Sequence, residues 1–145
     1  RPSVQRLAFT KACVAAVKVL SEENASLLVV GNTDSAMFPK ELLPYTTRRD
    51  FGKGGVKINF LVNYSWEWDL GLKNGMIGPK LGTADVSRVD LVIRWGGRRR
   101  LSGFLPVQSV YSDFYVVDDY WPDFSPRHVE EAISWYSRQD VTLGG

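Results

Sequence analysis

The sequence predicts an α/β fold with a mostly parallel central sheet flanked by helices. Short, continuously apolar runs end at turn residues, which is typical of strands that helices cover on both faces. Segments in which apolar residues recur at the helical period lie around these runs. With 145 residues, of which 44% are hydrophobic and 23% charged, the chain is expected to form one domain, 1–145, with a sizeable core.

The first half of the chain is expected to hold one helix and two strands. Apolar residues recur at close to the helical period over 3–20, which predicts the first helix. The apolar run Leu27–Val30 enters Gly31, and the run 56–62 enters Asn63. Both runs are therefore predicted to be strands that end at a turn.

The second half is expected to begin with a long loop. Residues 65–88 show no clear period and contain several glycines, which break any helix that might start there. Strands are then expected at 89–93 and 114–117, and helices at about 102–112 and 126–138. Because ligands in open α/β sheets bind beyond the carboxyl ends of the strands, the residues after 93 are the first place to look for a site.

The composition excludes several classes of protein. The formal net charge is only +2, so no whole-protein field would attract nucleic acid, and any basic site must be local. The single cysteine, Cys13, lies among apolar residues and predicts a buried helical thiol in a reducing compartment. No apolar run is long enough to span a bilayer. We expect a cytoplasmic protein, in which Trp66 and Trp68 either face a ligand or a membrane surface or pack down their own loop.

The segment Val92–Ser102, VIRWGGRRRLS, carries the strongest signal for a binding site. Gly96 and Gly97 permit the close approach and positive φ of an amide nest that binds an anion. Arginine binds phosphate through several N–H donors, and Arg94 and Arg100 are the arginines expected to do so. The segment therefore predicts a diphosphate site at the end of a strand.

Three other residues of this segment have different expected roles. Ser102 is expected to begin a helix whose N-terminus would add free amides and the positive end of its dipole. Arg98 and Arg99 are expected to be solvated. A surface turn in which all the arginines are solvated is the alternative interpretation, since basic runs are usually solvated.

Carboxylates follow the basic segment. Asp113, Asp118, Asp119 and Asp123 are available for Mg²⁺, which combines one or two carboxylates with phosphate oxygens. Asp118 and Asp119 are expected instead to form a turn. His128 is the only histidine and has no second histidine or cysteine beside it, so we expect a surface residue rather than a metal ligand.

From residue 89 onward, many residues form a dense and ordered pattern. They are Val89–Arg94, Gly96–Gly97, Arg100–Ser102, Phe104–Leu105, Gln108, Tyr111–Ser112, Tyr115, Trp121–Phe124, Arg138, Asp140 and Gly144–Gly145. This pattern resembles the carboxyl-terminal half of the cis-prenyltransferases, the undecaprenyl diphosphate synthase family. Gly31, Pro39 with Leu42, and Asn63–Tyr64 fit the earlier strands of the same family more loosely.

The resemblance implies a reaction and its binding residues. Isopentenyl diphosphate would condense with an allylic diphosphate, with Mg²⁺ and release of pyrophosphate, adding five-carbon units in the cis configuration. The resemblance implies that Arg94, Arg100 and Ser102 hold the isopentenyl diphosphate beside a turn formed by Gly96 and Gly97. It also implies a dimer, either of two identical chains or with a homologous subunit.

Two residues near the ends of the chain also match the family. Arg1 resembles the arginine of an Arg-Pro pair that contacts diphosphate, and Gly145 resembles a terminal glycine that reaches the partner subunit's site. Asp113 stands at the position of the family's metal-binding glutamate, with a reach shorter by one methylene. Trp95 stands where a small threonine is usual, and the segment between residues 63 and 89 is shorter than the family's helical insert.

The largest departure concerns the family's amino-terminal strand and its Asp-Gly-Asn-Gly-Arg-Trp turn, which these 145 residues lack. The aspartate of that turn supports the leaving diphosphate and Mg²⁺. We therefore expect a domain that is incomplete at its amino terminus and has no turnover by itself. A non-catalytic partner subunit of a heteromeric cis-prenyltransferase is the alternative function, and a plain anion-binding domain is a third.

Overall fold

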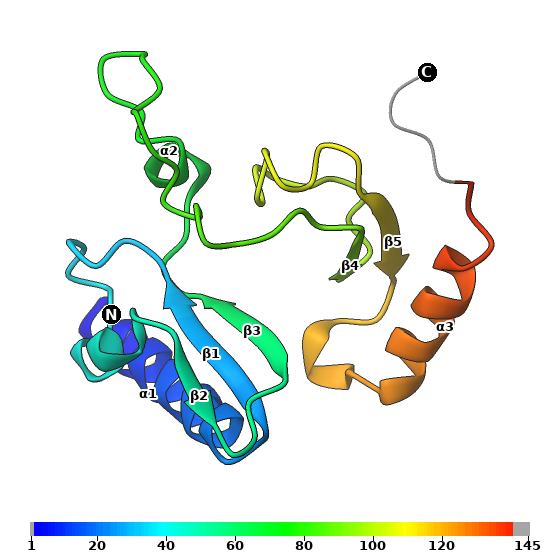
Figure 1. Ribbon diagram of the computed structural model, residues 1–145, viewed down its shortest axis with the longest axis horizontal. Coiled ribbons are helices and arrows are strands. Elements are labelled where there is room, and N and C mark those ends of the chain that lie inside the picture. The colour runs from blue at the N-terminus through cyan, green and yellow to red at the C-terminus, as the bar shows by residue number, and fades with distance from the viewer. Residues whose placement is uncertain (1, 141–145) are drawn as a thin grey trace. The chain divides into compact units, whose positions relative to one another are not determined.

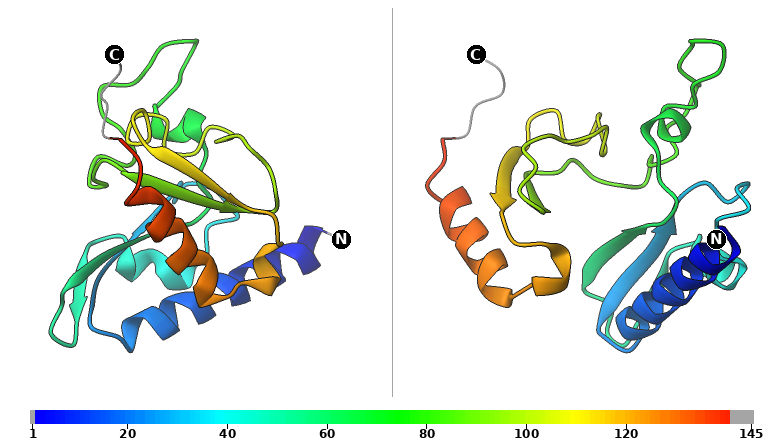
Figure 2. Two further views of the ribbon diagram at one scale, coloured as in Figure 1. Left: turned by 90° about the vertical axis from the view of Figure 1, so that its right-hand side faces the viewer. Right: turned by 180° about the vertical axis from the view of Figure 1, so that it is seen from behind.

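The computed structural model describes residues 2–140, and the chain divides into two compact units, Arg1–Ala84 and Asp85–Gly145 (Figures 1 and 2). The α/β prediction is confirmed, because each unit contains helices and strands. Within residues 2–140 the strands form two sheets, one in each unit, so the single central sheet and the single domain stay predictions. No helix in this part of the chain is long and apolar enough to cross a membrane.

The first unit is a helix packed on a three-stranded sheet. Its elements are α1 (Pro2–Ser21), β1 (Ala25–Val30), the 3-10 helix η1 (Lys40–Tyr45), β2 (Arg49–Phe51), β3 (Val56–Leu61) and the single turn α2 (Trp66–Asp69). β1 lies in the middle of the sheet, antiparallel to β2 and parallel to β3. The helix expected at 3–20 and the strands expected at 27–30 and 56–62 are confirmed, whereas η1 and β2 are additions that the sequence patterns did not predict.

The core of this unit forms where α1 covers β1. Every residue of β1 is buried, and Cys13 and Val17 of α1 pack in one cluster with Leu27 and Val29 of β1. The predicted buried thiol is confirmed, and burial raises the pKa of Cys13 above its ordinary value. β3, the parallel neighbour of β1, therefore pairs with a strand whose residues are all buried.

The long loop expected at 65–88 is confirmed except for the single turn of α2. A fully buried carboxylate, that of Asp69, holds it together. This group accepts hydrogen bonds from the Tyr64 hydroxyl at 2.8 Å, from the Thr83 amide at 2.9 Å and from Thr83 Oγ1 at 2.7 Å. Residues from both ends of the loop thus meet at one side chain.

The second unit contains one parallel strand pair and one amphipathic helix. Its elements are β4 (Leu91–Trp95), β5 (Asp113–Val117), the 3-10 helix η2 (Trp121–Asp123) and α3 (Pro126–Tyr136). β4 and β5 pair in parallel. α3 covers one face of this pair, where the rings of Tyr115 and Trp135 lie 5.5 Å apart. The strands expected at 89–93 and 114–117 and the helix expected at 126–138 are confirmed with small shifts at their ends.

The helix predicted at about 102–112 is wrong. This segment forms consecutive turns between β4 and β5. Ser102, Gly103 and Leu105 have φ values of 52°, 78° and 42°, and a right-handed helix requires negative φ. Ser102 consequently begins no helix, so the helix N-terminus expected to add amides at the basic segment is not formed.

Candidate functional site

The basic segment folds back on Arg94 at the carboxyl end of β4. Arg94 projects from the strand, and its Nη1 donates hydrogen bonds to the Arg100 carbonyl and, at 3.1 Å, to Ser102 Oγ. Arg94 therefore contacts the backbone of Arg100 and the side chain of Ser102, which lies eight positions further along the chain. Arg98 and Arg99 are exposed, as expected, and Arg99 lies only 3.8 Å from the exposed Asp118 carboxylate.

Gly96 and Gly97 form the turn that follows Arg94 and Trp95. Their φ values are 96° and 71°, so the predicted positive φ is confirmed, and side chains rarely tolerate this conformation. Their amides, however, donate to the Asp119 carbonyl at 2.9 Å and to the Val117 carbonyl at 3.1 Å. The expectation of an open amide nest is therefore wrong: these two donors anchor the turn to the last residue of β5 and to the chain that follows it.

A cavity of about 320 Å³ adjoins Arg94. Its lining is Val92, Ile93, Arg94, Leu101, Phe104 and Phe114. Apart from the arginine, every lining side chain is apolar. The cavity thus combines one cationic wall with an apolar interior, which suits a small ligand that has an anionic head and a hydrocarbon tail.

Asp113 lies apart from Arg94. The parallel register pairs it with Leu91 and pairs Arg94 with Val116, so the two positions are three residues apart along the strand pair, about 10 Å. Because side chains alternate between the faces of a sheet, Asp113 projects to the face of Trp95 and Tyr115, which α3 covers, and Arg94 projects to the other. The structure therefore does not bring the predicted metal ligand to the predicted diphosphate ligands.

Residues 2–140 contain no group of three or more His, Cys, Asp or Glu side chains placed to hold a metal ion. Asp113 could offer Mg²⁺ one carboxylate, but its face of the sheet separates it from Arg94. The described residues of the second unit thus do not fit a Mg²⁺ site shared with Arg94. Arg1 and Gly145, the other two predicted site residues, lie outside the described residues.

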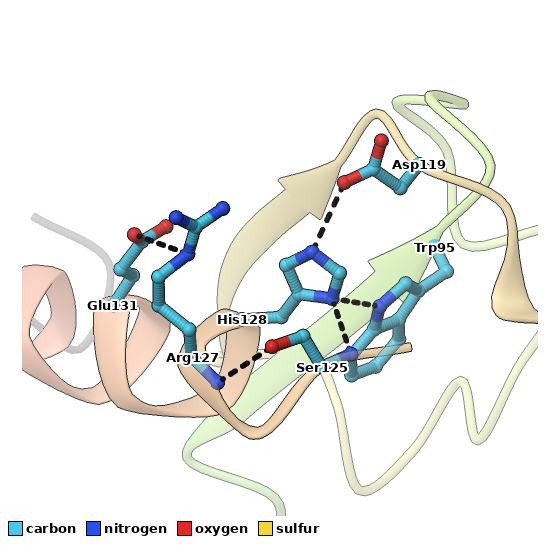
Figure 3. A network of polar contacts seen from close by, with 6 residues as sticks. All are labelled: Trp95, Asp119, Ser125, Arg127, His128 and Glu131. Atoms are coloured by element: carbon cyan, nitrogen blue, oxygen red, sulfur yellow. Dashed lines mark hydrogen bonds and ion pairs between the residues drawn. The ribbon is translucent and has the colours of Figure 1, made fainter. Parts of the chain in front are cut away.

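The expectation that His128 is a surface residue is wrong. Only 5% of the residue is exposed, and it accepts hydrogen bonds at Nδ1 from the Trp95 indole at 3.0 Å and from the Ser125 amide at 3.1 Å. Its Nε2 lies 3.0 Å from Asp119 Oδ2 (Figure 3). Asp119 therefore binds a side chain rather than only shaping a turn.

A local signal could have identified this arrangement. Ser125 precedes His128 by three residues at the start of α3, and the two form a reciprocal capping box. The usual partner of a capping serine is Glu or Gln three residues later, and the histidine takes that place here. The prediction of a surface residue rested on the lack of a second histidine or cysteine and did not include this cap.

Comparisons with known proteins agree with the resemblance found in the sequence. The family model described as putative undecaprenyl diphosphate synthase matches residues 3–144. Relatives include the ditrans,polycis-undecaprenyl-diphosphate synthases, (2E,6E)-farnesyl-diphosphate specific, of Aliivibrio fischeri (29% identical; 88% of this chain, 58% of the relative) and of Buchnera aphidicola subsp. Schizaphis graminum (30% identical; 100% and 68%). An isoprenyl transferase of Geobacillus kaustophilus is 31% identical over 87% of this chain and 57% of its own length.

The chain thus spans little more than half the length of two of these relatives and about two thirds of the third. The family match nevertheless covers both units, from α1 to the residues beyond α3. It includes the strand end that carries Arg94, Arg100 and Ser102. The chain therefore belongs to the undecaprenyl diphosphate synthase family, the cis-prenyltransferases.

Proposed function

We propose that this chain is part of a cis-prenyl chain-elongating transferase and that its basic turn holds isopentenyl diphosphate. The observation that carries the proposal is the cavity at the end of β4, where Arg94 faces an otherwise apolar lining. A diphosphate would lie against the guanidinium, and a five-carbon tail would fill the apolar part. Each buried methylene contributes about 0.8 kcal/mol to retention of the tail.

Arg94 is suited to hold the diphosphate head. Both of its hydrogen bonds to Arg100 and Ser102 use Nη1, so the N–H donors on Nε and Nη2 can fork around phosphate oxygens. The same bonds hold the Arg100 backbone and the Ser102 hydroxyl next to the guanidinium. The three residues act as anchors rather than as proton-transfer groups.

The proposed reaction requires the isopentenyl diphosphate site to anchor its substrate. A carbon–carbon bond forms between the alkene of isopentenyl diphosphate and the allylic carbon, the allylic carbon–oxygen bond breaks, and pyrophosphate and a proton leave. The alkene is neutral and a weak nucleophile, so its own diphosphate must hold it near the electrophilic carbon. The charge that develops on the leaving group requires cationic stabilisation in the transition state.

A non-catalytic partner subunit of a heteromeric cis-prenyltransferase is the second candidate. The position of Asp113 favours it, because this carboxylate and Arg94 project from opposite faces of the strand pair. In this arrangement the basic turn would work together with groups of another chain. We propose a dimer for either candidate, and Mg²⁺ as the metal of the complete enzyme.

The remaining proposals concern the complete fold and its location. We propose that the complete enzyme has one mostly parallel central sheet within a single domain. The reducing compartment indicated by the single cysteine is the cytoplasm. Peripheral membrane contact is supported by the exposed apolar residues of the long loop: Trp66, Met76 and Ile77 are 40%, 72% and 67% exposed.

Calorimetric titration with isopentenyl diphosphate and with inorganic pyrophosphate tests the site directly. Arg94→Ala should weaken isopentenyl diphosphate binding about 30-fold or more, since a charge-assisted, bidentate contact is lost. Arg98→Ala removes the same charge from an exposed neighbour and should change the affinity less than threefold. Equal losses in the two variants would show that the segment is only a diffuse basic surface.

Three further results separate the candidates. Tighter binding of isopentenyl diphosphate than of pyrophosphate supports the isoprenoid assignment, and equal binding supports a plain anion site. The intact mass of the sample and its turnover with isopentenyl diphosphate, an allylic diphosphate and Mg²⁺ are then measured together. A mass near 16.3 kDa without product, followed by activity on adding a catalytic homologue, would favour the partner subunit.

A further inference from the structure

The hydrogen bonds around His128 determine its tautomer. The Trp95 indole nitrogen and the Ser125 backbone nitrogen are both donors only, and both lie within 3.1 Å of Nδ1. Nδ1 must therefore be the unprotonated acceptor. The proton of the neutral ring is on Nε2, where it is donated to Asp119 Oδ2 at 3.0 Å.

This histidine joins three separate segments of the second unit (Figure 3). Trp95 comes from the last position of β4, Asp119 from the chain after β5, and Ser125 from the N-cap of α3. Asp119 makes a second contact with the strand end, because its carbonyl accepts the Gly96 amide. Asp119 thus holds the backbone after Trp95 while His128 holds the indole.

Aromatic packing supports the same tryptophan. The Trp95 ring lies 5.0 Å from that of Trp121, edge to face, and 5.7 Å from that of Phe124. His128 supplies the only hydrogen bond that the described residues show for the indole N–H. The aromatic rings confine the indole, and the histidine determines its orientation.

The position of Trp95 also affects Arg94, which lies on the other face of β4. Arg94 immediately precedes Trp95, and the two side chains project to opposite faces of the strand. Any rotation of the strand end that displaces Trp95 also displaces the base of the Arg94 side chain. We propose that His128 is a positioning residue: through Trp95 and Asp119 it keeps the Arg94–Gly97 strand end in the orientation that binds diphosphate.

This inference rests on the proposed diphosphate site, and variants of His128 test it by calorimetric titration with inorganic pyrophosphate. His128→Asn retains an oxygen acceptor near the place of Nδ1, and His128→Gln instead retains an amide donor near the place of Nε2. We expect His128→Asn to bind within about twofold of the unmodified chain. His128→Gln and Trp95→Phe should each weaken binding about five- to tenfold, as expected for the loss of one well-placed contact.

Non-additivity and a spectroscopic signature separate positioning from a general loss of stability. The double variant Trp95→Phe/His128→Gln should bind no more weakly than either single variant, because both break the same hydrogen bond. Since His128 is the only histidine, its ring nitrogens are identified by NMR without assignment of the whole chain. They should show the Nε2–H tautomer in the unmodified chain and in Arg94→Ala.

Arg127→Ala is the matched control on α3, because Arg127 is exposed and pairs only with Glu131 at 3.3 Å among the described ion pairs. It should bind pyrophosphate within twofold of the unmodified chain. Wild-type affinity in folded His128→Gln and Trp95→Phe, or an Nδ1–H tautomer, would overturn the positioning role while leaving the site intact. Failure of the proposed function is different: Arg94→Ala would then bind as tightly as the unmodified chain.

Discussion

The buried carboxylate of Asp69 gives the sharpest prediction for stability. Its exposure is 0%, and it accepts three hydrogen bonds, two from Thr83 and one from Tyr64. A hydrogen bond to a charged group contributes about 1.5–3 kcal/mol. The three bonds share one carboxylate and are not additive, and removing the group also relieves its desolvation cost. We expect Asp69→Ala to lower the free energy of unfolding by about 3–4 kcal/mol.

Two further substitutions separate the contributions to this loss of stability, and a third is the control. Asp69→Asn keeps the shape of the side chain and an oxygen acceptor for Thr83, and should cost about 1–2 kcal/mol. Thr83→Val keeps the backbone hydrogen bond to Asp69 and removes the side-chain hydroxyl, so it should cost about 1 kcal/mol or more. Asp85→Ala removes a carboxylate from an exposed position nearby and should stay within about 0.5 kcal/mol.

The assay is urea unfolding followed by tryptophan fluorescence. Trp68 reports on this loop directly, because its ring packs edge to face on Tyr64 at 6.2 Å. The order of losses should be Asp69→Ala, then Asp69→Asn, then Asp85→Ala. A loss below about 1 kcal/mol for Asp69→Ala would refute the reasoning, since the loop would then be held mainly by other contacts.

Three further predictions test packing, thiol chemistry and capping. Gly31→Ala should lower the free energy of unfolding, measured by heating, by about 3 kcal/mol or more, because the new Cβ would lie 1.6 Å from the Val62 carbonyl oxygen. Gly75→Ala is the control: the φ of Gly75 is 75° but the space around it is open, so the loss should be only about 1 kcal/mol. Because burial raises the pKa of Cys13, its neutral thiol should react slowly with a disulfide reagent at about pH 8 and rapidly in urea. The same shift contributes stability that is fully present below the pKa of the thiol in the unfolded chain and is lost as the pH rises through its pKa in the folded chain. Ser125→Ala should cost about 1 kcal/mol, measured by helical circular dichroism on heating, as expected for a lost N-cap.

The sequence predicted those elements whose signal is local. The helix over 3–20 follows from the spacing of its apolar residues, and the strands at 27–30 and 89–93 follow from continuous apolar runs that end at turns. The helix expected at 102–112 failed because Ser102, Gly103 and Leu105 adopt positive φ. β2 was not predicted because this short strand has exposed residues at Arg49 and Asp50 and no apolar alternation.

In the candidate site, too, the sequence predicted the features that have a local signal and missed those that depend on distant residues. The residue types of the VIRWGGRRRLS segment predicted an anion site, which stays a prediction, and the structure places Arg94 against the Arg100 carbonyl and the Ser102 hydroxyl. The availability of the glycine amides was not predictable, since their acceptors, the carbonyls of Val117 and Asp119, lie about 20 residues further along the chain. Such pairs form only when β4 and β5 align.

By itself, therefore, the sequence determined the α/β class, the buried Cys13, the basic turn at a strand end and the resemblance to the cis-prenyltransferases. These properties depend on residue type and on spacing within one segment. The tertiary structure alone decided that His128 is buried between Trp95 and Asp119, and that Asp113 projects from the face opposite Arg94. The physical reason is the register of the β4–β5 pair: a shift of one residue would reverse every side chain's face, and no local pattern specifies it.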